Sequence, residues 1–177
     1  MIDRVLAGTR SALKQSRAVT IGMLGLVVGA TVFTPPAPML VWNVSASAPI
    51  GLYSVHPRAH VGTGDMVIVR LPGLFRSFAA HRHYLPANVP LVKRVAAVAS
   101  DRVCARGRVV RVNGRWAASR RRFDRQGRAL PWWQGCRTLR SGELFLLMDH
   151  PASFDGRYFG PIARADVIGR ARRLWTR

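Results

Sequence analysis

Lysine and acidic residues are scarce in this chain of 177 residues. Lysine and arginine together number 28, yet only Lys14 and Lys93 are lysines, and aspartate and glutamate together number 8. The formal net charge is therefore +20. Arginine keeps its proton at every useful pH, whereas a buried lysine can lose it. Because arginine serves wherever charge alone is needed, Lys93, the lone lysine beyond the N-terminal region, is a candidate general base.

Cysteine is also scarce, with Cys104 and Cys136 as the only two. An even pair in a domain outside the cytosol favours one disulfide. Two buried free thiols and a metal site are the alternatives, but the histidines do not stand at ligand spacing from either cysteine. We expect a disulfide, no metal and no cofactor.

Recognised nucleic-acid-binding motifs are absent from the sequence. The charge of +20 is compatible with binding to DNA or anionic lipid. There is, however, no zinc-finger spacing, no basic helix with heptads and no RNP-like strand. A solvated, arginine-rich surface explains the charge equally well, and we expect no nucleic-acid partner.

Charged residues are missing between Arg17 and Arg58. The first part of this gap, residues 18–34, is apolar and just within the length range of a membrane-spanning helix, which Pro35-Pro36 should end. Basic residues precede the apolar run. The positive-inside rule therefore puts residues 1–17 in the cytoplasm and residues 35–177 in the periplasm. This predicts a single-pass protein of the bacterial inner membrane, with membrane lipid as a partner.

A cleavable signal peptide is the competing interpretation, because Ala46-Ser47-Ala48 has the small residues of a cleavage site. That triplet lies well beyond the apolar run. Pro49 would also follow the cut directly, where its ring and missing N–H fit an extended protease substrate poorly. A buried helix of a soluble protein is a third interpretation, and the asymmetric flanking charge argues against it. We favour an uncleaved anchor.

The remainder of the chain has the patterns of β-strands. Asn113-Gly114 between alternating residues predicts a hairpin over residues 108–116. Residues 71–88 are less regular and fit a short helix or a loop, and residues 119–128 read as an arginine-rich loop. Buried strands are predicted at residues 66–69, 91–98, 143–148 and 167–171. The predicted fold class is a mainly β domain behind one N-terminal helix.

Lys93 falls inside the predicted buried strand, among Leu91, Val92 and Val95. Burial disfavours an ammonium group and lowers its pKa, and a general base works best with a pKa near the operating pH. Arg94 should face away, since side chains alternate along a strand. Ser47 is the candidate nucleophile for such a base, although a serine between alanines usually just forms a loop.

Several segments, taken together, resemble a known family. Their order and chemistry resemble the type I signal peptidases, which are serine–lysine membrane proteases, and within them the TraF-type peptidases of conjugative transfer. The resemblance covers residues 18–173. It is carried by Ser47-Ala48-Pro49-Ile50-Gly51-Leu52-Tyr53 after the apolar run, Gly64-Asp65-Met66-Val67-Ile68-Val69, Lys93-Arg94-Val95 with Asp101, the run from Asp149 to Pro161, and Ile168-Gly169-Arg170-Ala171.

The resemblance implies a signal-peptidase-like, β-rich catalytic domain and a role for six residues. Ser47 would be the nucleophile and Lys93 the general base. The Ser45 hydroxyl and the Ser47 backbone N–H would form the oxyanion hole, and Ser153 would orient the lysine amine, unless Ser153 is only a turn residue. The resemblance also implies that Asp155 and Arg157 form a charged pair that supports the site. In the TraF-type branch, Asp155 is a candidate for a residue that activity itself requires.

Several other residues have more than one interpretation. Asp155 and Arg157 could serve only to pin a loop, and a serine–lysine mechanism needs no role for the neighbouring His150. Trp132-Trp133 fit either the membrane interface or core packing. The run from Arg120 to Arg128 fits either a site for lipid phosphates or a partner, or a solvated loop.

The resemblance implies a serine endopeptidase that matures a pilin precursor of a conjugative transfer or type IV secretion system. It also allows an amine to resolve the acyl-enzyme, which would join the pilin ends into a ring. Ala48 and Gly156 stand where ordinary signal peptidases have methionine and serine, which favours the conjugative branch. The alternatives are a general type I signal peptidase acting on membrane-inserted preproteins, and a basic anchored assembly protein that binds DNA or anionic lipid.

Overall fold

The computed structural model describes residues 19–27, 29 and 39–176, and the chain divides into two compact units, residues 1–37 and 38–177. In the first unit, residues 19–27 and 29 are helical, and residues 19–27 are exposed. The predicted cytoplasmic segment, residues 1–17, and part of the predicted anchor, residues 18–34, lie outside the described residues. Within the described part of the chain, no helix combines the length and the apolar character that a membrane crossing requires.

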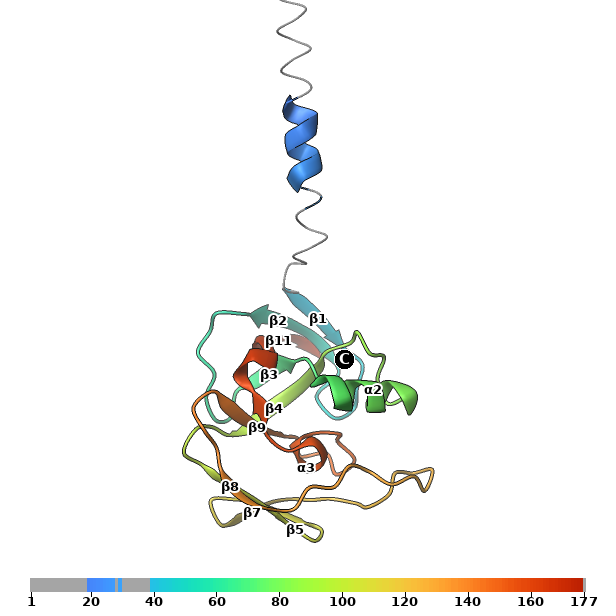
Figure 1. Ribbon diagram of the computed structural model, residues 1–177, viewed down its shortest axis with the longest axis vertical. Helices are drawn as coiled ribbons and strands as arrows, with labels where there is room; N and C mark the ends of the chain where they lie inside the picture. Colours follow the sequence, from blue (N-terminus) through green and yellow to red (C-terminus); the bar gives the residue numbers. More distant parts are fainter. Residues whose placement is uncertain (1–18, 28, 30–38, 177) are drawn as a thin grey trace, which may run out of the picture. The chain divides into compact units, whose positions relative to one another are not determined.

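The second unit is built from two antiparallel sheets (Figure 1). The larger has seven strands in the order β1 (Leu40–Asn43), β2 (Gly51–His56), β11 (Val167–Thr176), β3 (Met66–Val69), β4 (Leu91–Ala97), β9 (Glu143–Leu147) and β10 (Ile162–Ala163). The smaller has four, in the order β7 (Arg115–Ser119), β6 (Val109–Val112), β5 (Arg102–Arg106) and β8 (Gly135–Thr138). The helices of this unit are α2 (Gly73–His81), the short α3 (Gly156–Phe159) and the 3-10 turn η1 (Arg164–Asp166).

The mainly β character predicted from the sequence is confirmed for this unit. Strand β3 has the predicted bounds, and β4 and β9 each end one residue before the predicted strand. The predicted hairpin is β6–β7, and its turn residues Asn113 and Gly114 have φ of 50° and 79°, as a two-residue turn of this kind requires. Strands β1, β2, β5, β8 and β10 were not predicted, because their short runs carry weak patterns.

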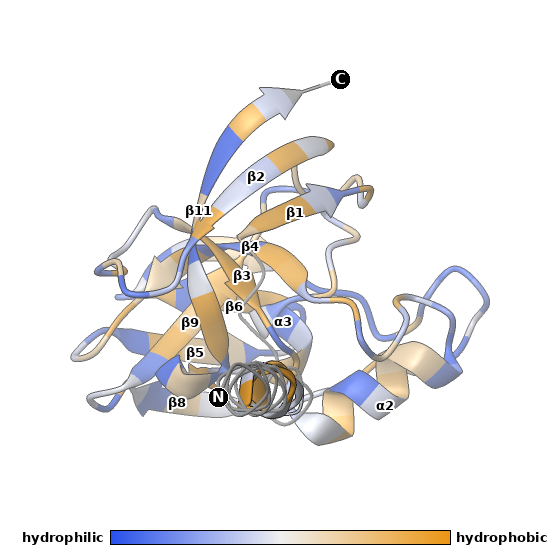
Figure 2. Cartoon of the chain, turned by 90° about the horizontal axis from the view of Figure 1, so that it is seen from above, coloured by the Kyte–Doolittle hydropathy of each residue, from blue (hydrophilic) through white to orange (hydrophobic). Residues whose placement is uncertain are grey.

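Strand β9 explains how one short apolar run can lie at the centre of the unit. Leu144 and Leu146 belong to one core cluster, whereas Phe145 and Leu147 belong to the cluster that includes Val103 and other residues of the smaller sheet. Both faces of β9 are therefore covered, which accounts for its continuous rather than alternating apolar pattern. Figure 2 shows the apolar colour on the central strands β3, β4 and β9, with hydrophilic loops around them.

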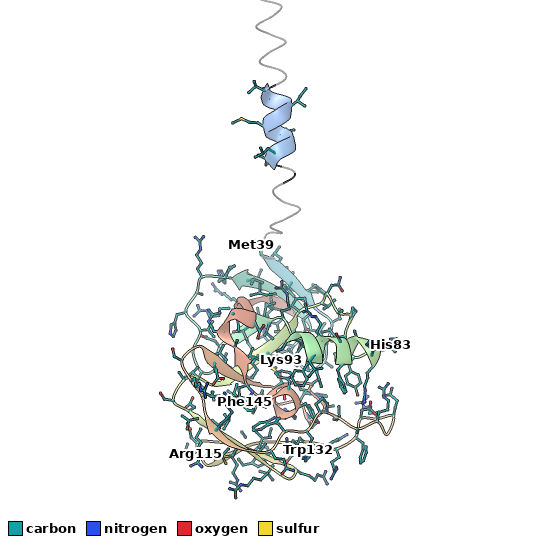
Figure 3. The ribbon with its side chains drawn as sticks, viewed as in Figure 1. Met39, His83, Lys93, Arg115, Trp132 and Phe145 are labelled. Carbon is teal, nitrogen blue, oxygen red and sulfur yellow. A yellow bond between two sulfur atoms is a disulfide. The ribbon has the colours of Figure 1, made fainter. Side chains whose placement is uncertain are left out.

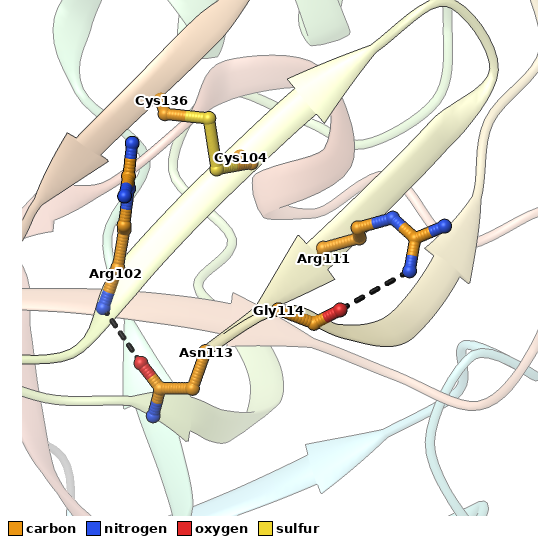
Figure 4. Close-up of a disulfide and its surroundings, with 6 residues drawn as sticks. All are labelled: Arg102, Cys104, Arg111, Asn113, Gly114 and Cys136. Atoms are coloured by element: carbon orange, nitrogen blue, oxygen red, sulfur yellow. Dashed lines mark hydrogen bonds between the residues drawn. A yellow bond between two sulfur atoms is a disulfide. The ribbon is translucent and has the colours of Figure 1, made fainter.

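The predicted disulfide is confirmed and lies in the smaller sheet (Figure 4). Cys104 on β5 stands directly opposite Cys136 on β8, and the two sulfurs are bonded. Two residues before Cys104, the Arg102 N–H donates a hydrogen bond of 2.8 Å to the side-chain oxygen of Asn113. Both contacts fasten segments of the smaller sheet to β5.

Gly156 permits α3 to lie directly against β9. A Cβ atom added at this position would stand 2.6 Å from the carbonyl oxygen of Leu146 and 2.8 Å from Cε2 of Phe145. Neither neighbour can easily retreat, because one is strand backbone and the other is a fully buried ring. Any side chain at this position would therefore push α3, and Asp155 at its N-cap, away from the sheet.

We expect Gly156→Ala to lower the free energy of unfolding by about 1–3 kcal/mol, because the new methyl group overpacks the contact with β9. The matched control is Gly62→Ala, where the nearest atom to an added Cβ is Cε1 of His60 at 3.8 Å. Urea unfolding of the two variants and the unchanged chain measures the effect. Equal stability of both variants would contradict the packing argument.

Candidate active site

Ser47 lies in the tight loop between β1 and β2, and the buried side chain of Asn43 holds this loop together. The Asn43 amide donates to the carbonyl oxygens of Ser45, Ala48 and Pro49 at 3.0, 3.1 and 3.1 Å. Its own oxygen accepts from the Ser45 N–H at 3.1 Å. The two N–H groups of the amide thus share three acceptors, and together with the accepted bond they fix the path of the backbone around Ser47.

Asn43 was not predicted to have this role, although an asparagine at a strand end was the available signal. Tyr53 on β2 supports the same loop, since its hydroxyl donates to the carbonyl oxygen of Pro49 at 2.8 Å. The two residues are buried, at the start and just beyond the end of the loop. The sequence motif thus singles out Ser47 but not the two residues that hold its loop in place.

Lys93 lies on β4, with its side chain on the same face as Leu91 and Val95 because side chains alternate along a strand. Those two neighbours belong to the main core cluster, and Lys93 itself is only 1% exposed. Figure 3 shows Lys93 in the interior of the unit. Arg94 faces the other way, as predicted, and forms an ion pair with Asp149 at 2.8 Å.

The Lys93 amine contacts two serine hydroxyls. Its Nζ donates to Oγ of Ser47 at 3.1 Å and to Oγ of Ser153 at 2.8 Å. Ser153 is 1% exposed, and its backbone N–H donates to the carbonyl oxygen of His150 at 3.0 Å. The fold thus brings together three residues from distant parts of the chain, with the amine between the two hydroxyls.

Burial lowers the pKa of Lys93 from 10.5 to about 8. The negative charge of Asp155 opposes this shift by raising the pKa, while the positive charge of Arg157 lowers it further. At pH 8 about half of the Lys93 amines are therefore neutral, against fewer than about one in a hundred for an exposed lysine. A neutral amine at hydrogen-bond distance is able to accept the proton of a serine hydroxyl.

Asp155 and Arg157 form a buried ion pair that closes the segment carrying Ser153. The two side chains are 0% and 2% exposed and meet in two hydrogen bonds of 2.8 and 3.1 Å. Asp155 also accepts from the Met148 N–H at 3.0 Å, and Arg157 donates to the carbonyl oxygens of Met148 and Pro151 at 2.5 and 3.2 Å. The pair fastens residues 148–155 at several points, so it positions Ser153.

Ser45 lies beside Ser47, and the two groups expected to form an oxyanion hole contact each other. The Ser45 hydroxyl accepts from the Ser47 N–H at 3.3 Å and is 2.9 Å from the Ser47 hydroxyl. An oxygen atom of a ligand can take the place of the Ser45 hydroxyl at the Ser47 N–H. The Ser45 hydroxyl would then be free to turn and donate to the same oxygen.

A cleft of about 490 Å³ opens over these residues. Ser45, Ser47 and Lys93 line it together with residues at the end of α2 and seven residues between Arg121 and Leu130. His150 also lines the cleft, but its Nδ1 accepts from the Ala152 N–H at 3.2 Å. In the described part of the chain, no hydrogen bond joins His150 to Ser47 or Lys93. Residues 19–27, 29 and 39–176 also contain no cluster of three or more potential metal ligands.

The interpretation of residues 120–128 as a solvated arginine loop is wrong for Arg120. Its side chain is 1% exposed and donates to the carbonyl oxygens of Gly107 and Trp133 at 2.9 and 2.6 Å. The guanidinium also lies 3.7 Å from the centre of the Trp132 ring. Trp133 donates to the carbonyl oxygen of Gly156 at 3.0 Å. The two tryptophans therefore take part in packing within the unit.

The fold and the site define a class: a β-rich protein with a buried lysine amine hydrogen-bonded to a serine in an open cleft. Residues 12–175 match the family described as signal peptidase, peptidase S26. The chain belongs to this family. The resemblance inferred from its motifs is thereby confirmed.

The chain is similar to conjugal transfer and plasmid transfer proteins. The conjugal transfer protein TraF of Agrobacterium fabrum (strain C58) is 36% identical over 167 residues, which cover 88% of this chain and 93% of that protein. A plasmid transfer protein TraF of Escherichia coli is 36% identical over 146 residues, covering 76% of this chain and 81% of that protein. A crystal structure of a signal peptidase I from Enterococcus faecalis V583 is similar with a TM-score of 0.38 and 20% identity, over 63% of this chain and 97% of that one.

The burial of Lys93 should make stability depend on pH. Since its pKa is about 8 in the folded chain and 10.5 in the unfolded chain, the unfolded chain binds more protons between these values. Stability therefore rises with pH across this window, and below pH 8 the protonated amine costs about 3 kcal/mol. We expect Lys93→Met to remove this rise, whereas Ser47→Ala should keep it. Urea unfolding between pH 7 and pH 10.5 measures both, and an unchanged pH slope in Lys93→Met would contradict the assignment.

Proposed function

We propose that this chain is a membrane-anchored serine endopeptidase that matures a pilin precursor of a conjugative transfer or type IV secretion system. The observation that carries the proposal is the Lys93 amine, buried and hydrogen-bonded to Ser47 at 3.1 Å. Membership of the signal peptidase family supports the chemistry. The names of its conjugal and plasmid transfer relatives support the biological setting.

In the first step of the proposed mechanism, neutral Lys93 takes the proton of the Ser47 hydroxyl. The Ser47 oxygen attacks the carbonyl carbon of the scissile peptide bond and forms a tetrahedral intermediate. The C–N bond then breaks, and Lys93 returns the proton to the leaving amine. Ser153 keeps the lysine amine directed at Ser47 during both proton transfers, which is consistent with its 2.8 Å contact.

The negative charge on the intermediate is stabilised by the Ser47 N–H and the Ser45 hydroxyl. A single donor of this kind contributes about 2.7–4 kcal/mol of transition-state stabilisation. The substrate carbonyl oxygen displaces the Ser45 hydroxyl from the Ser47 N–H, and that hydroxyl turns to donate to it. The four hydrogen bonds of Asn43 keep both donors in place.

The acyl-enzyme on Ser47 is resolved either by water, which gives a linear product, or by a peptide amine. In both cases Lys93 takes a proton from the attacking group and returns it to Ser47. An amine that belongs to the same pilin would close a ring. The two products of a given pilin segment differ by one water molecule.

The substrate binds as an extended strand along the first half of β4. Strand β9 pairs with β4 only from Arg94 onward. In the described part of the chain, Leu91–Lys93 therefore pair with β3 alone, and Leu91 and Lys93 line the cleft. An unpaired strand edge beside the catalytic groups suits the addition of a substrate strand.

The charge pattern of the sequence supports the proposed location. Residues 18–34 anchor the chain in the bacterial inner membrane, with residues 1–17 in the cytoplasm and residues 35–177 in the periplasm. The disulfide between Cys104 and Cys136 fits an oxidising compartment. Membrane lipid and the membrane-inserted precursor are the proposed partners, and no nucleic acid is among them.

A general type I signal peptidase is the second candidate function, favoured by the description of the family. Growth of a signal-peptidase-depleted host separates the two candidates, because only a general signal peptidase would restore it. A basic assembly protein without catalytic activity is the non-enzymatic alternative. Its binding to DNA or anionic lipid would weaken steeply with salt and would not depend on Ser47 or Lys93.

Co-expression with a pilin precursor tests the dyad directly. We expect Ser47→Ala and Lys93→Arg each to reduce processing by more than about a hundredfold, because the first removes the nucleophile and the second a base that can be neutral. The matched controls are Ser77→Ala and Arg94→Lys, which change an exposed serine and an arginine on the other face of β4. Intact-mass analysis of the pilin measures processing and tells a linear product from a ring. Full processing by both dyad variants would rule out the protease assignment.

The pH dependence of cleavage should follow the pKa of Lys93. Since the neutral amine is the active form, we expect kcat/KM to rise about tenfold per pH unit at low pH and to level off above about pH 8. The control is His150→Gln, which should leave the midpoint unchanged. A midpoint that disappears in His150→Gln would instead identify His150 as the base.

A further inference from the structure

The cleft that contains Ser47 and Lys93 is also lined by several arginines. Asp124 is the one carboxylate among the described residues that line the cleft. Apolar side chains, including Leu71, Leu91 and Phe154, also line it. The arginines that line it are Arg82, Arg121, Arg125 and Arg128. The cleft therefore combines an apolar lining with an excess of positive charge.

Asp124 is already occupied by neighbouring groups and neutralises little of this charge. Its carboxylate accepts from Nε of Arg128 at 2.7 Å and from the Tyr84 hydroxyl, and it lies 3.8 Å from Arg82. Although partial burial raises the pKa of Asp124, these hydrogen bonds outweigh burial and lower the pKa well below its usual range. Asp124 therefore stays ionised and paired, and it fastens residues 121–130 to the segment that follows α2.

Arg121 and Arg125 have no such partner. Within the described residues, neither guanidinium forms a hydrogen bond or an ion pair, and both side chains are exposed on the cleft. The turn that carries them is nevertheless fixed. Phe123 and Ala129 form a β-bridge, and the Asp124 N–H donates to the Arg128 carbonyl oxygen at 2.9 Å. Two unpaired cations thus stand on a preformed turn, whereas the other arginines that line the cleft are engaged.

We propose that Arg121 and Arg125 select substrates that carry a carboxylate close to the bond that is cut. An arginine fork binds a carboxylate through two parallel hydrogen bonds, so it reads both charge and geometry. The carboxylate is either an acidic side chain or the free C-terminus of the peptide. This inference rests on the proposed function, since the cleft receives substrate only if Ser47 and Lys93 cut it.

Peptide binding to the full-length Ser47→Ala chain in detergent tests the proposal without cleavage. The probes are fluorescent alanine–leucine peptides that carry one glutamate at each position in turn. A matched series has glutamine in place of the glutamate, and every peptide is made with a free and with an amidated C-terminus. Fluorescence anisotropy at about 50 and 300 mM salt gives the affinities and shows how far salt weakens them. We expect a carboxylate at one position to tighten binding by about three- to thirtyfold, less at the higher salt.

The arginine variants decide whether the cleft is responsible. Arg121→Gln with Arg125→Gln should abolish the preference for the carboxylate. The matched control is Arg106→Gln with Arg115→Gln, which removes the same charge from exposed positions on the smaller sheet. Figure 3 shows Arg115 at the opposite edge of the unit from His83, which lines the cleft. The control variant should keep the preference.

Four results would overturn the proposal. The first is equal binding of glutamate and glutamine peptides with either C-terminus, and the second is a preference that survives in the Arg121→Gln, Arg125→Gln variant. The third is an equal loss of the preference in the control variant. The fourth is that the Arg121→Gln, Arg125→Gln variant loses only its binding to anionic lipid vesicles and keeps its binding to the peptides. A preference that follows the glutamate position or the free C-terminus supports it and identifies which carboxylate is read. Its failure is separable from that of the proposed function, because loss of processing in Ser47→Ala and Lys93→Arg, without any carboxylate preference, overturns only this inference.

Discussion

The burial of one amine in an apolar strand is the constraint on which the site depends. Lys93 lies on the core face of β4, where an ammonium group is poorly solvated, so its pKa falls to about 8. A buried amine must also keep its hydrogen bonds, and Ser47 and Ser153 supply the partners. The same burial therefore gives the lysine its usable basicity and fixes the geometry of the two serines around it.

The segments that present these serines are held by buried polar side chains. Asn43 fixes the loop of Ser47 through four hydrogen bonds, and the Asp155–Arg157 pair closes the segment of Ser153. Removing one member of a buried ion pair leaves an uncompensated buried charge. A substitution of either residue alone is therefore strongly destabilising. Gly156 lets this pair approach β9, which links the packing of the core to the position of Ser153.

Positive charge is divided between two physical roles in this unit. Arg120 and Arg157 are buried, and each donates to several backbone carbonyl oxygens, so these arginines act as internal cross-links. Arg121 and Arg125 stand on the cleft without a side-chain partner among the described residues. The segment of residues 120–130 thus begins with a structural arginine and continues with exposed ones. Neighbouring residues of the same type have different roles because one faces the core and the others face the cleft.

The residue patterns alone indicated the family and the main strands, and they favoured a bond between Cys104 and Cys136 over free thiols or a metal site. A lone lysine in an apolar run made Lys93 a candidate base, whereas the role of Ser47 followed from the resemblance of several segments to the signal peptidases. Which side chains meet depends on the packing of the fold. The burial of Arg120, the role of Asn43 and the shape of the cleft arise from contacts between segments far apart in the chain. Such contacts depend on how the sheets pack, and no local pattern of residues records them.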